Sequence, residues 1–412
     1  MRRVFALLAA AAVAASAGIA LAGNTGQDFS QIERGRYLAT AGDCAGCHTK
    51  PGGQAFAGGL AVETPFGNVI APNITPDKTA GIGLWSDGDF ARAMTEGIRR
   101  DGKHLFPAMP YPYLTKLDRD DVLAIRAYLA TVPAVENSVK ADQLPFPLSV
   151  RADMAAWNKL NFTPGAFQRN LDKGDAWNRG AYLVEGLMHC GACHTPKNVA
   201  GGDKSGERLQ GYALQGWFAP DLTTHPKRGI GSWSADDLVA YLKTGHNRFS
   251  AATGPMADVV THSSSKLTDA DLHAVATYLK DQPAPNEESP QPVASSDPAM
   301  KAGAAIYADE CSACHAPHGA GIANLFPRLA GSPSVQSTDP TSLIRVVLAG
   351  TQSVATDHAP TAPSMPAFGE TLDDREAAAV LTYIRNAWGN AATAVSAGEV
   401  AKHRDSLAKR GE

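Results

Sequence analysis

Apolar residues recur at helical spacing in two sets of three segments. The first set covers residues 32–41, 177–187 and 299–310. Apolar side chains at i, i+3, i+4 and i+7 share one face of a helix, so each segment predicts a short amphipathic helix. The second set is predicted by an N-cap acceptor followed three residues later by an acid, a pattern that favours a helix start. These pairs are Asp118 with Asp121, Thr268 with Asp271, and Asp373 with Glu376. The pattern predicts a mostly α-helical chain that contains three copies of one unit.

The first two units also share sequence outside their helices. Residues 71–75 (APNIT) match 219–223 (APDLT), and residues 81–86 (GIGLWS) match 229–234 (GIGSWS), at one common offset. Internal similarity of this kind indicates a duplication. The third unit lacks the second of these segments and is the more divergent copy. With 39 glycines and 27 prolines in 412 residues, all three units are expected to be rich in loops.

Each unit contains one C-x-x-C-H motif, and the three motifs use all six cysteines of the chain. The pattern is typical of c-type haem attachment, in which two thioethers hold the vinyl groups and the histidine binds the iron. A zinc site would pair two C-x-x-C units, and a thioredoxin-like site would occur once, so neither fits three complete motifs. The sequence therefore predicts three covalent haems, with the residues Cys44, Cys47 and His48; Cys190, Cys193 and His194; and Cys311, Cys314 and His315.

A second iron ligand is expected on the opposite face of each haem. One methionine per unit lies in a loop bounded by proline or glycine, at an equivalent place before the last helix: Met109, Met256 and Met365. Three other methionines fall within predicted helices and are interpreted as core residues: Met94, Met188 and Met300. Four histidines compete for the ligand role, but none recurs in all three units: His104, His246, His262 and His358.

The first residues predict export from the cytoplasm. Arg2 and Arg3 precede an alanine-rich apolar run, and Ala20-Leu21-Ala22 forms an A-x-A cleavage site before Gly23. The mature protein is expected to be periplasmic, and the rest of the chain has no apolar run of about 18 residues that could span a membrane. The formal net charge of −4 at pH 7 becomes more negative once the two arginines are removed. A negatively charged protein is not expected to bind nucleic acid.

The boundaries follow from these features. In chain order we predict a signal peptide at 1–22, domain one at 23–140, a connector at 141–175, domain two at 176–281, a flexible linker at 282–298, domain three at 299–390 and a C-terminal tail at 391–412.

The connector is apolar and aromatic, so it either packs between domains or docks a partner. The linker is rich in Pro, Ser and Glu, which predicts a solvated strap and a loosely held domain three. The tail carries scattered basic residues and is expected to be a solvated helix or a membrane contact.

Sequence between the haem motifs resembles a known family. The segments that carry the resemblance are 41–44 (AGDC), 73–77 (NITPD), 107–111 (PAMPY), 256–260 (MADVV) and 339–343 (DPTSL). They are similar to the triheme cytochrome c subunits of membrane-associated periplasmic dehydrogenases, namely the quinone-linked alcohol dehydrogenase and the gluconate, sorbitol, fructose and aldehyde dehydrogenases. The resemblance covers nearly the whole mature chain.

This resemblance implies three tandem class I cytochrome c-like domains, each folded around one covalent haem. It also implies that the protein takes electrons from a catalytic subunit with PQQ, FAD or molybdenum and passes them to ubiquinone, at the outer face of the cytoplasmic membrane. Some relatives end in an apolar anchoring helix, whereas residues 391–412 contain four basic residues and few large apolar ones. Peripheral contact with the membrane is therefore expected.

Three other functions stay open. The protein could be the cytochrome subunit of a nicotinate-type molybdenum hydroxylase, or a free periplasmic electron shuttle. It could also be a multihaem enzyme, which needs an open iron position. Three methionine candidates for three haems count against that last interpretation.

Overall fold

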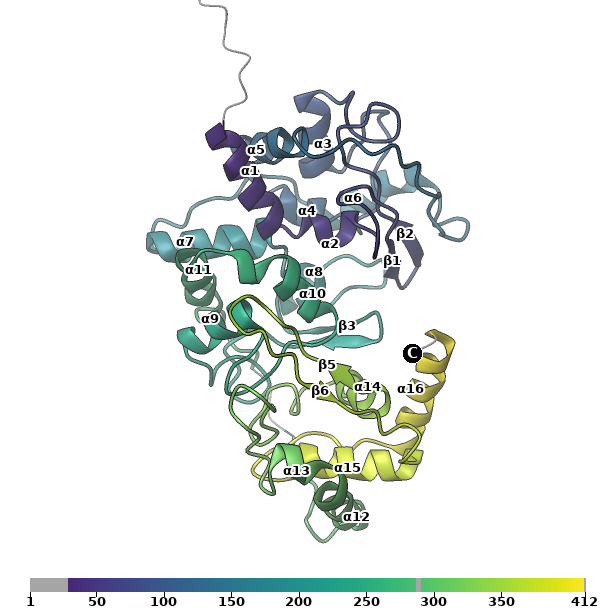
Figure 1. The fold of residues 1–412 in the computed structure, drawn as a ribbon, viewed down its shortest axis with the longest axis vertical. Helices are drawn as coiled ribbons and strands as arrows, with labels where there is room; N and C mark the ends of the chain where they lie inside the picture. Colours follow the sequence, from purple (N-terminus) through teal and green to yellow (C-terminus); the bar gives the residue numbers. More distant parts are fainter. Residues whose placement is uncertain (1–28, 287–289, 411–412) are drawn as a thin grey trace, which may run out of the picture.

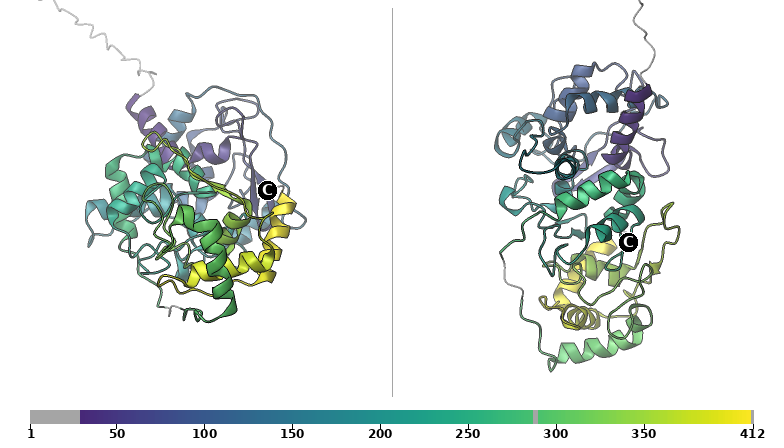
Figure 2. Two further views of the ribbon diagram at one scale, coloured as in Figure 1. Left: turned by 60° about the horizontal axis from the view of Figure 1, so that its bottom comes forward. Right: turned by 90° about the vertical axis from the view of Figure 1, so that its left-hand side faces the viewer.

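The computed structural model describes residues 29–286 and 290–410, so the predicted signal peptide at 1–22 lies outside the described residues. Three helical units follow one another along the long axis of the molecule (Figures 1 and 2). We call residues 29–140, 175–281 and 298–410 domains one, two and three. Each domain has one two-stranded antiparallel hairpin, and loops make up much of the rest. The prediction of a mostly helical, loop-rich chain is confirmed.

Domain one and the connector contain the following elements: α1 (Phe29–Ala41), α2 (Cys44–His48), β1 (Ala61–Thr64), β2 (Gly67–Ile70), α3 (Asp87–Glu96), α4 (Tyr111–Leu114), α5 (Arg119–Leu129), a 3-10 turn (Arg151–Asp153) and α6 (Met154–Asn161). Domain two contains α7 (Asp175–Tyr182), a π-helical turn (Leu183–Leu187), α8 (Gly191–His194), a 3-10 turn (Ser205–Glu207), β3 (Tyr212–Leu214), β4 (Trp217–Ala219), α9 (Ala235–Thr244), α10 (Pro255–His262), a 3-10 turn (Ser264–Lys266) and α11 (Asp269–Leu279). Domain three contains α12 (Pro298–Ile306), a π-helical turn (Tyr307–Cys311), α13 (Ser312–His315), α14 (Thr341–Ala349), β5 (Thr351–Gln352), β6 (Ser364–Met365), α15 (Asp374–Asn386) and α16 (Ala397–Arg410).

In every domain the helix before the haem motif crosses the predicted capped helix. The pairs are α1 with α5, α7 with α11, and α12 with α15. A glycine lies at each crossing, and a Cβ atom there would overlap the carbonyl oxygen of the opposite helix. These glycines and the residues they meet are Gly35 at Ala124, Gly180 at Ala274, and Gly303 at Ala379. The two helices therefore touch backbone to backbone, which only glycine permits.

The predicted N-cap acceptor caps its helix in domains two and three, and the reciprocal capping box is complete only in domain three. Asp373 accepts hydrogen bonds from the backbone of α15, and the side chain of Glu376 bonds back to the cap residue, so this capping box is complete. In domain two Thr268 accepts from the backbone N–H of Asp271, but the Asp271 side chain bonds elsewhere. In domain one Asp118 makes no side-chain cap bond. The prediction of three equivalent caps is wrong, because Asp121 and Asp271 serve a contact between domains.

Domains one and two exchange the same polar contact in both directions. Each acid accepts one hydrogen bond from an arginine of its own domain and one from a tyrosine of the other domain. Asp121 binds Arg34 Nε (2.6 Å) and Tyr182 Oη (2.7 Å), and Asp271 binds Arg179 Nε (2.8 Å) and Tyr37 Oη (2.7 Å). The duplication thus builds a reciprocal interface in which each domain supplies the same residues.

Replacing Asp271 by alanine should lower the free energy of unfolding by about 2–3 kcal/mol, because it leaves Arg179 and Tyr37 without their shared acceptor. Burial alone would raise the pKa of Asp271, but hydrogen bonds from Arg179 and Tyr37 outweigh it and the pKa is lowered. A lowered pKa contributes stability above the ordinary Asp pKa of about 3.9, and this contribution is lost as the pH falls below it. The difference between the two proteins in urea unfolding should therefore shrink below about pH 4. The exposed Asp236→Ala change is the control and should cost no more than about 0.5 kcal/mol.

The connector packs between domains over part of its length. The Phe162 ring lies 5.2 Å from Tyr111 of domain one, and the Phe167 ring lies 5.8 Å from Tyr182 of domain two. Phe146 is 84% exposed and Leu160 is 82% exposed. Packing of the connector between domains is therefore confirmed for Phe162 and Phe167, whereas a partner-docking role stays a prediction for the exposed Phe146 and Leu160.

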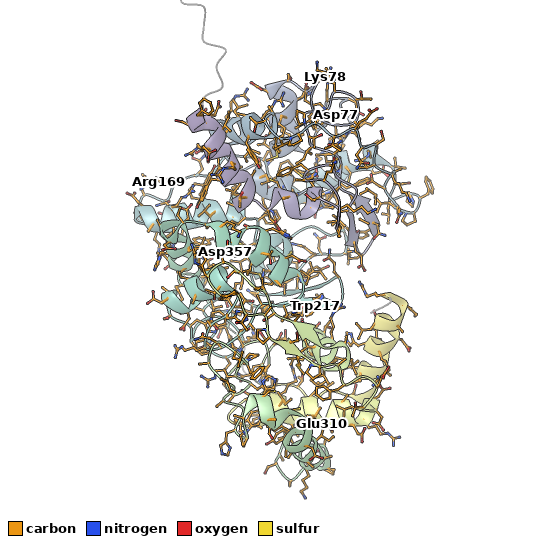
Figure 3. The ribbon with its side chains drawn as sticks, viewed as in Figure 1. Asp77, Lys78, Arg169, Trp217, Glu310 and Asp357 are labelled. Atoms are coloured by element: carbon orange, nitrogen blue, oxygen red, sulfur yellow. The ribbon has the colours of Figure 1, made fainter. Side chains whose placement is uncertain are left out.

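Domain three is held against domain two by the long loop between β5 and β6. Val354 packs on Val260 and Ala252, and Ser353 Oγ lies 2.9 Å from His246 Nε2. An ion pair of 2.9 Å joins Lys266 to Asp357 at the tip of the loop, which lies over domain two in Figure 3. The linker composition does not indicate this contact, and how rigidly it holds domain three stays a prediction.

The C-terminal segment is part of the folded core. Val400 and Leu407 of α16 are buried, and Arg404 Nε bonds to Asp374 at 2.9 Å. At the end of the helix Arg410 donates two hydrogen bonds of 2.6 Å to Glu63 of β1, so α16 links domain three to domain one (Figure 1). The prediction of a solvated tail at 391–412 is wrong. None of the described helices has the length and apolar character needed to cross a bilayer.

Candidate haem sites

Each C-x-x-C-H motif forms one short helical turn directly after the first helix of its domain. The turns are α2, α8 and α13, and in domains two and three a π-helical turn leads into the motif. None of the six cysteines forms a disulfide. Burial raises the pKa of Cys44 and of Cys190 to about 12. The thiols are therefore neutral and lie in apolar surroundings, which suits attachment to a hydrophobic macrocycle.

The three motif histidines are oriented by the same contact. In each, ring Nδ1 lies at hydrogen-bonding distance from a prolyl carbonyl oxygen. The pairs are His48 with Pro72 (2.7 Å), His194 with Pro220 (2.7 Å) and His315 with Pro327 (2.9 Å). A carbonyl can only accept, so Nδ1 carries the proton and the lone pair is on Nε2, as an iron ligand requires. Burial also lowers the pKa of all three imidazoles, which keeps them neutral. The residues present fit a haem c in each domain.

The three candidate methionines are partly buried and pack against the hydrophobic core. Met109 and Met256 pack against the same hydrophobic cluster as Cys44 and Cys190. Met365 lies in β6 opposite Thr351 and packs against the cluster that contains Cys311. Of the methionines predicted to be core residues, Met94 and Met300 are each 6% exposed, and Met188 is partly buried and packs against the core.

The competing histidines lie in other surroundings. Both ring nitrogens of His246 are engaged, Nδ1 by the Thr244 carbonyl at 3.1 Å and Nε2 by Ser353. His262 and His358 are exposed at the surface. The ring of His104 lies 3.5 Å from the side-chain amide of Asn158 in the connector.

The motifs of domains one and two lie next to each other. Helix α10 of domain two packs against α2, and Ser263 Oγ donates to the Ala41 carbonyl oxygen at 2.9 Å. Burial raises the pKa of the Cys47 thiol, and Cys193 of domain two adds to this rise. The motif of domain three, on α13, lies apart from both (Figure 1). The chain therefore contains a close pair of haem motifs and a third, separate one.

Sequence reasoning missed the prolyl carbonyls that orient the histidines. Pro72 and Pro220 lie inside the repeated APNIT and APDLT segments, so the repeat was visible but its role was not. Pro327 lies in no repeated segment. The sequence does not indicate this role of the prolines, because a backbone carbonyl acts through its position and not through its side chain.

Comparison with known proteins identifies the family. The sequence model described as "Cytochrome c" matches three segments, residues 32–133, 177–283 and 300–388. The chain belongs to the cytochrome c family. The three segments each contain one C-x-x-C-H motif, so this cytochrome has three tandem domains and carries three covalent haems c.

Three relatives are similar over most of the cytochrome. The gluconate 2-dehydrogenase cytochrome c subunit of Pantoea cypripedii is 42% identical over 396 residues, which cover 90% of this chain and 89% of the relative. The alcohol dehydrogenase (quinone) cytochrome c subunit of Gluconacetobacter polyoxogenes is 39% identical, with 98% of this chain and 91% of the relative covered. A nicotinate dehydrogenase subunit of Pseudomonas putida is 40% identical over 87% of this chain, which spans 30% of that relative.

Proposed function

We propose that this cytochrome is the electron-transfer subunit of a periplasmic dehydrogenase complex. It accepts electrons from a catalytic subunit that oxidises an alcohol, sugar or aldehyde, and it delivers them to ubiquinone. The observation that carries this proposal is the similarity to the gluconate and alcohol dehydrogenase cytochrome subunits along about nine-tenths of the chain. The partner subunit, which contains PQQ, FAD or molybdenum, oxidises the substrate.

The haem ligands are proposed residue by residue. The thiols that attach the haems are Cys44, Cys47, Cys190, Cys193, Cys311 and Cys314. The residues that would hold the irons are His48 with Met109, His194 with Met256, and His315 with Met365. A bound haem c supplies a one-electron Fe(III)/Fe(II) couple. The histidines would hold the iron through Nε2, because Nδ1 is engaged by a prolyl carbonyl. A methionine opposite raises the reduction potential.

The proposal includes a place for the complex at the outer face of the cytoplasmic membrane. The protein is exported, contacts that membrane peripherally, and binds no nucleic acid. Exposed apolar residues of the connector, Phe146 and Leu160 among them, support a contact with the catalytic subunit, because uncovered apolar surface favours a partner. The packing of α16 on the protein itself means that the C-terminal helix is not proposed as the membrane contact.

Purification of the complex from native membranes tests this function. The cytochrome should be found with a catalytic subunit in equal amounts, and the partner's substrate should reduce the haems and then a ubiquinone analogue. Haem staining and a pyridine haemochrome assay should give three haems per chain. A cytochrome that purifies alone, and is reduced by no co-purified enzyme, would instead be a free shuttle. The second candidate, a nicotinate-type molybdenum hydroxylase partner, is favoured by the third relative and would be recognised by molybdenum in the complex.

A further inference from the structure

The hairpin that carries Met365 is short. It consists of two residue pairs, one of which joins Met365 to Thr351. Pro363 and Pro366 stand on either side of the β6 strand, and neither has a backbone N–H that could extend the ladder. A two-stranded hairpin of this size is at best marginally stable by itself. The place of Met365 therefore depends on contacts from outside the hairpin.

The other two candidate methionines are held within their own domains. Met256 lies at the second position of α10, a helix of eight residues. The backbone N–H of Met109 donates to the carbonyl of Phe106 at 3.0 Å, and the carbonyl of Met109 accepts from Tyr111 at 2.7 Å. In domain three, by contrast, the methionine lies on a strand of two residues. The loop before this strand, residues 353–363, reaches across to domain two.

Domain two binds this loop through His246. Both partners of the contact are buried, since His246 is 5% exposed and Ser353 is 8% exposed. Nδ1 of His246 lies 3.1 Å from the carbonyl oxygen of Thr244, which can only accept, so Nδ1 carries the proton. Nε2 is therefore an acceptor, and the Ser353 hydroxyl donates to it at 2.9 Å. Both ring nitrogens have partners, which fixes the tautomer and the orientation of the imidazole.

The residue after Ser353 adds an apolar contact. Val354 is buried and packs with Ala252 and Val260 of domain two. It also lies against the end of α9, where a Cβ atom at Gly245 would be 2.0 Å from Cγ1 of Val354. The start of the loop is therefore seated closely on domain two.

The same serine connects this seat to the methionine. Ser353 directly follows β5, and its backbone N–H donates to the carbonyl of Pro363 at 3.0 Å. Pro363 directly precedes β6 and lies two residues before Met365. Ser353 thus holds domain two with its side chain and the strand of Met365 with its backbone. A displacement of Ser353 therefore changes the place of Met365.

We propose that His246 is a positioning residue for the haem ligand of domain three. Through Ser353 it keeps the hairpin where Met365 can bind the iron, so domain two stabilises methionine ligation in domain three. The inference rests on the proposed ligand role of Met365. Because methionine ligation raises the reduction potential, domain three has its full potential only when it is docked on domain two.

Carbon monoxide binding to the reduced full-length protein with its three haems tests this positioning. Carbon monoxide binds an iron only after the methionine has left, so its apparent affinity measures how often Met365 is detached. Loss of one buried hydrogen bond shifts such an equilibrium by about tenfold. Ser353→Ala and His246→Ala should therefore each raise the carbon monoxide affinity of one haem by about tenfold. That haem should be the one whose redox wave Met365→Ala displaces.

Two further variants separate the hydrogen bond from packing. His246→Gln keeps a side-chain oxygen that can accept from Ser353, so it should stay near the wild-type affinity. Lys266→Ala removes an ion pair with Asp357 at the tip of the same loop (Figure 3). Both of these side chains are exposed, and such pairs contribute little, so Lys266→Ala should bind carbon monoxide like the wild type.

Three results would overturn the positioning. They are an unchanged affinity in Ser353→Ala, a change confined to another haem, and equal opening by His246→Gln and His246→Ala. Ser353→Ala removes a single oxygen atom, so it decides the matter if His246→Ala does not fold. If Met365→Ala bound carbon monoxide no better than the wild type, the ligand assignment would fail and the positioning with it. No catalytic subunit takes part in the measurement, so each of these results leaves the proposed transfer from a dehydrogenase to ubiquinone standing.

Discussion

A Gly303→Val protein is expected to lose the folded state of domain three while domains one and two stay intact. Gly303 lies where α12 crosses α15, and a Cβ atom there would be 2.7 Å from the carbonyl carbon of Ala379 and 2.7 Å from Cβ of Tyr383. Real Cβ contacts are longer than this, and the obstacle is helix backbone, which cannot rotate away. The helices must separate, so the cost should exceed the roughly 1–3 kcal/mol of ordinary overpacking. Limited proteolysis should cleave domain three first, and one of the three redox waves should be displaced.

The control for this substitution is Gly398→Val. Gly398 lies in α16 of the same domain, and a Cβ atom there meets nothing within 4 Å. This variant should resist protease like the wild type, because an exposed helical glycine is replaced without a clash and valine is the better helix former by a few tenths of a kcal/mol, on the order of helix-propensity differences. Equal protease resistance of Gly303→Val and Gly398→Val would show that the α12–α15 crossing does not need glycine.

The elements that could be predicted from the sequence are those that depend on residues close to one another in the chain. The helix predicted at 32–41 is observed as Phe29–Ala41. The face on which its apolar residues recur is the face that packs against the rest of the protein. The haem motifs could be found because thioether attachment requires two cysteines and a histidine within five consecutive residues. The crossing glycines, in contrast, stand among ordinary helix residues, and nothing in the sequence indicates which carbonyl each one meets.

The features that could not be predicted depend on contacts between distant segments. Asp121 and Asp271 have the spacing of helix caps, but arginines and tyrosines of the interface compete for their carboxylates and prevail. The segment from residue 391 looked too polar to pack, yet Val400 and Leu407 suffice because α14 and α15 offer them a complementary surface. A polar helix of this kind is held by its few apolar residues and by ion pairs that only the fold brings together.

Replacing a loop methionine by alanine should remove one methionine-coordinated centre and leave the other two unchanged. Met365→Ala is the sharpest case, because its motif lies apart from the adjacent pair of motifs in domains one and two. Loss of the thioether should lower the potential of that haem, within the roughly 0.8 V that axial ligands cover, and should open the iron to carbon monoxide. Spectroelectrochemical titration should show two unchanged waves and one at lower potential.

Met300→Ala separates ligation from packing within the same domain. Met300 is 6% exposed on α12 and belongs to the core, so its replacement should cost about 2–5 kcal/mol of stability and yet keep all three waves. His358 is the rival ligand of domain three, and it is exposed. If Met365→Ala left all three waves at their wild-type potentials and His358→Ala displaced one, the ligand of domain three would be histidine. Because a histidine ligand usually lowers the potential whereas a methionine raises it, that result would also predict a lower potential for the haem of domain three.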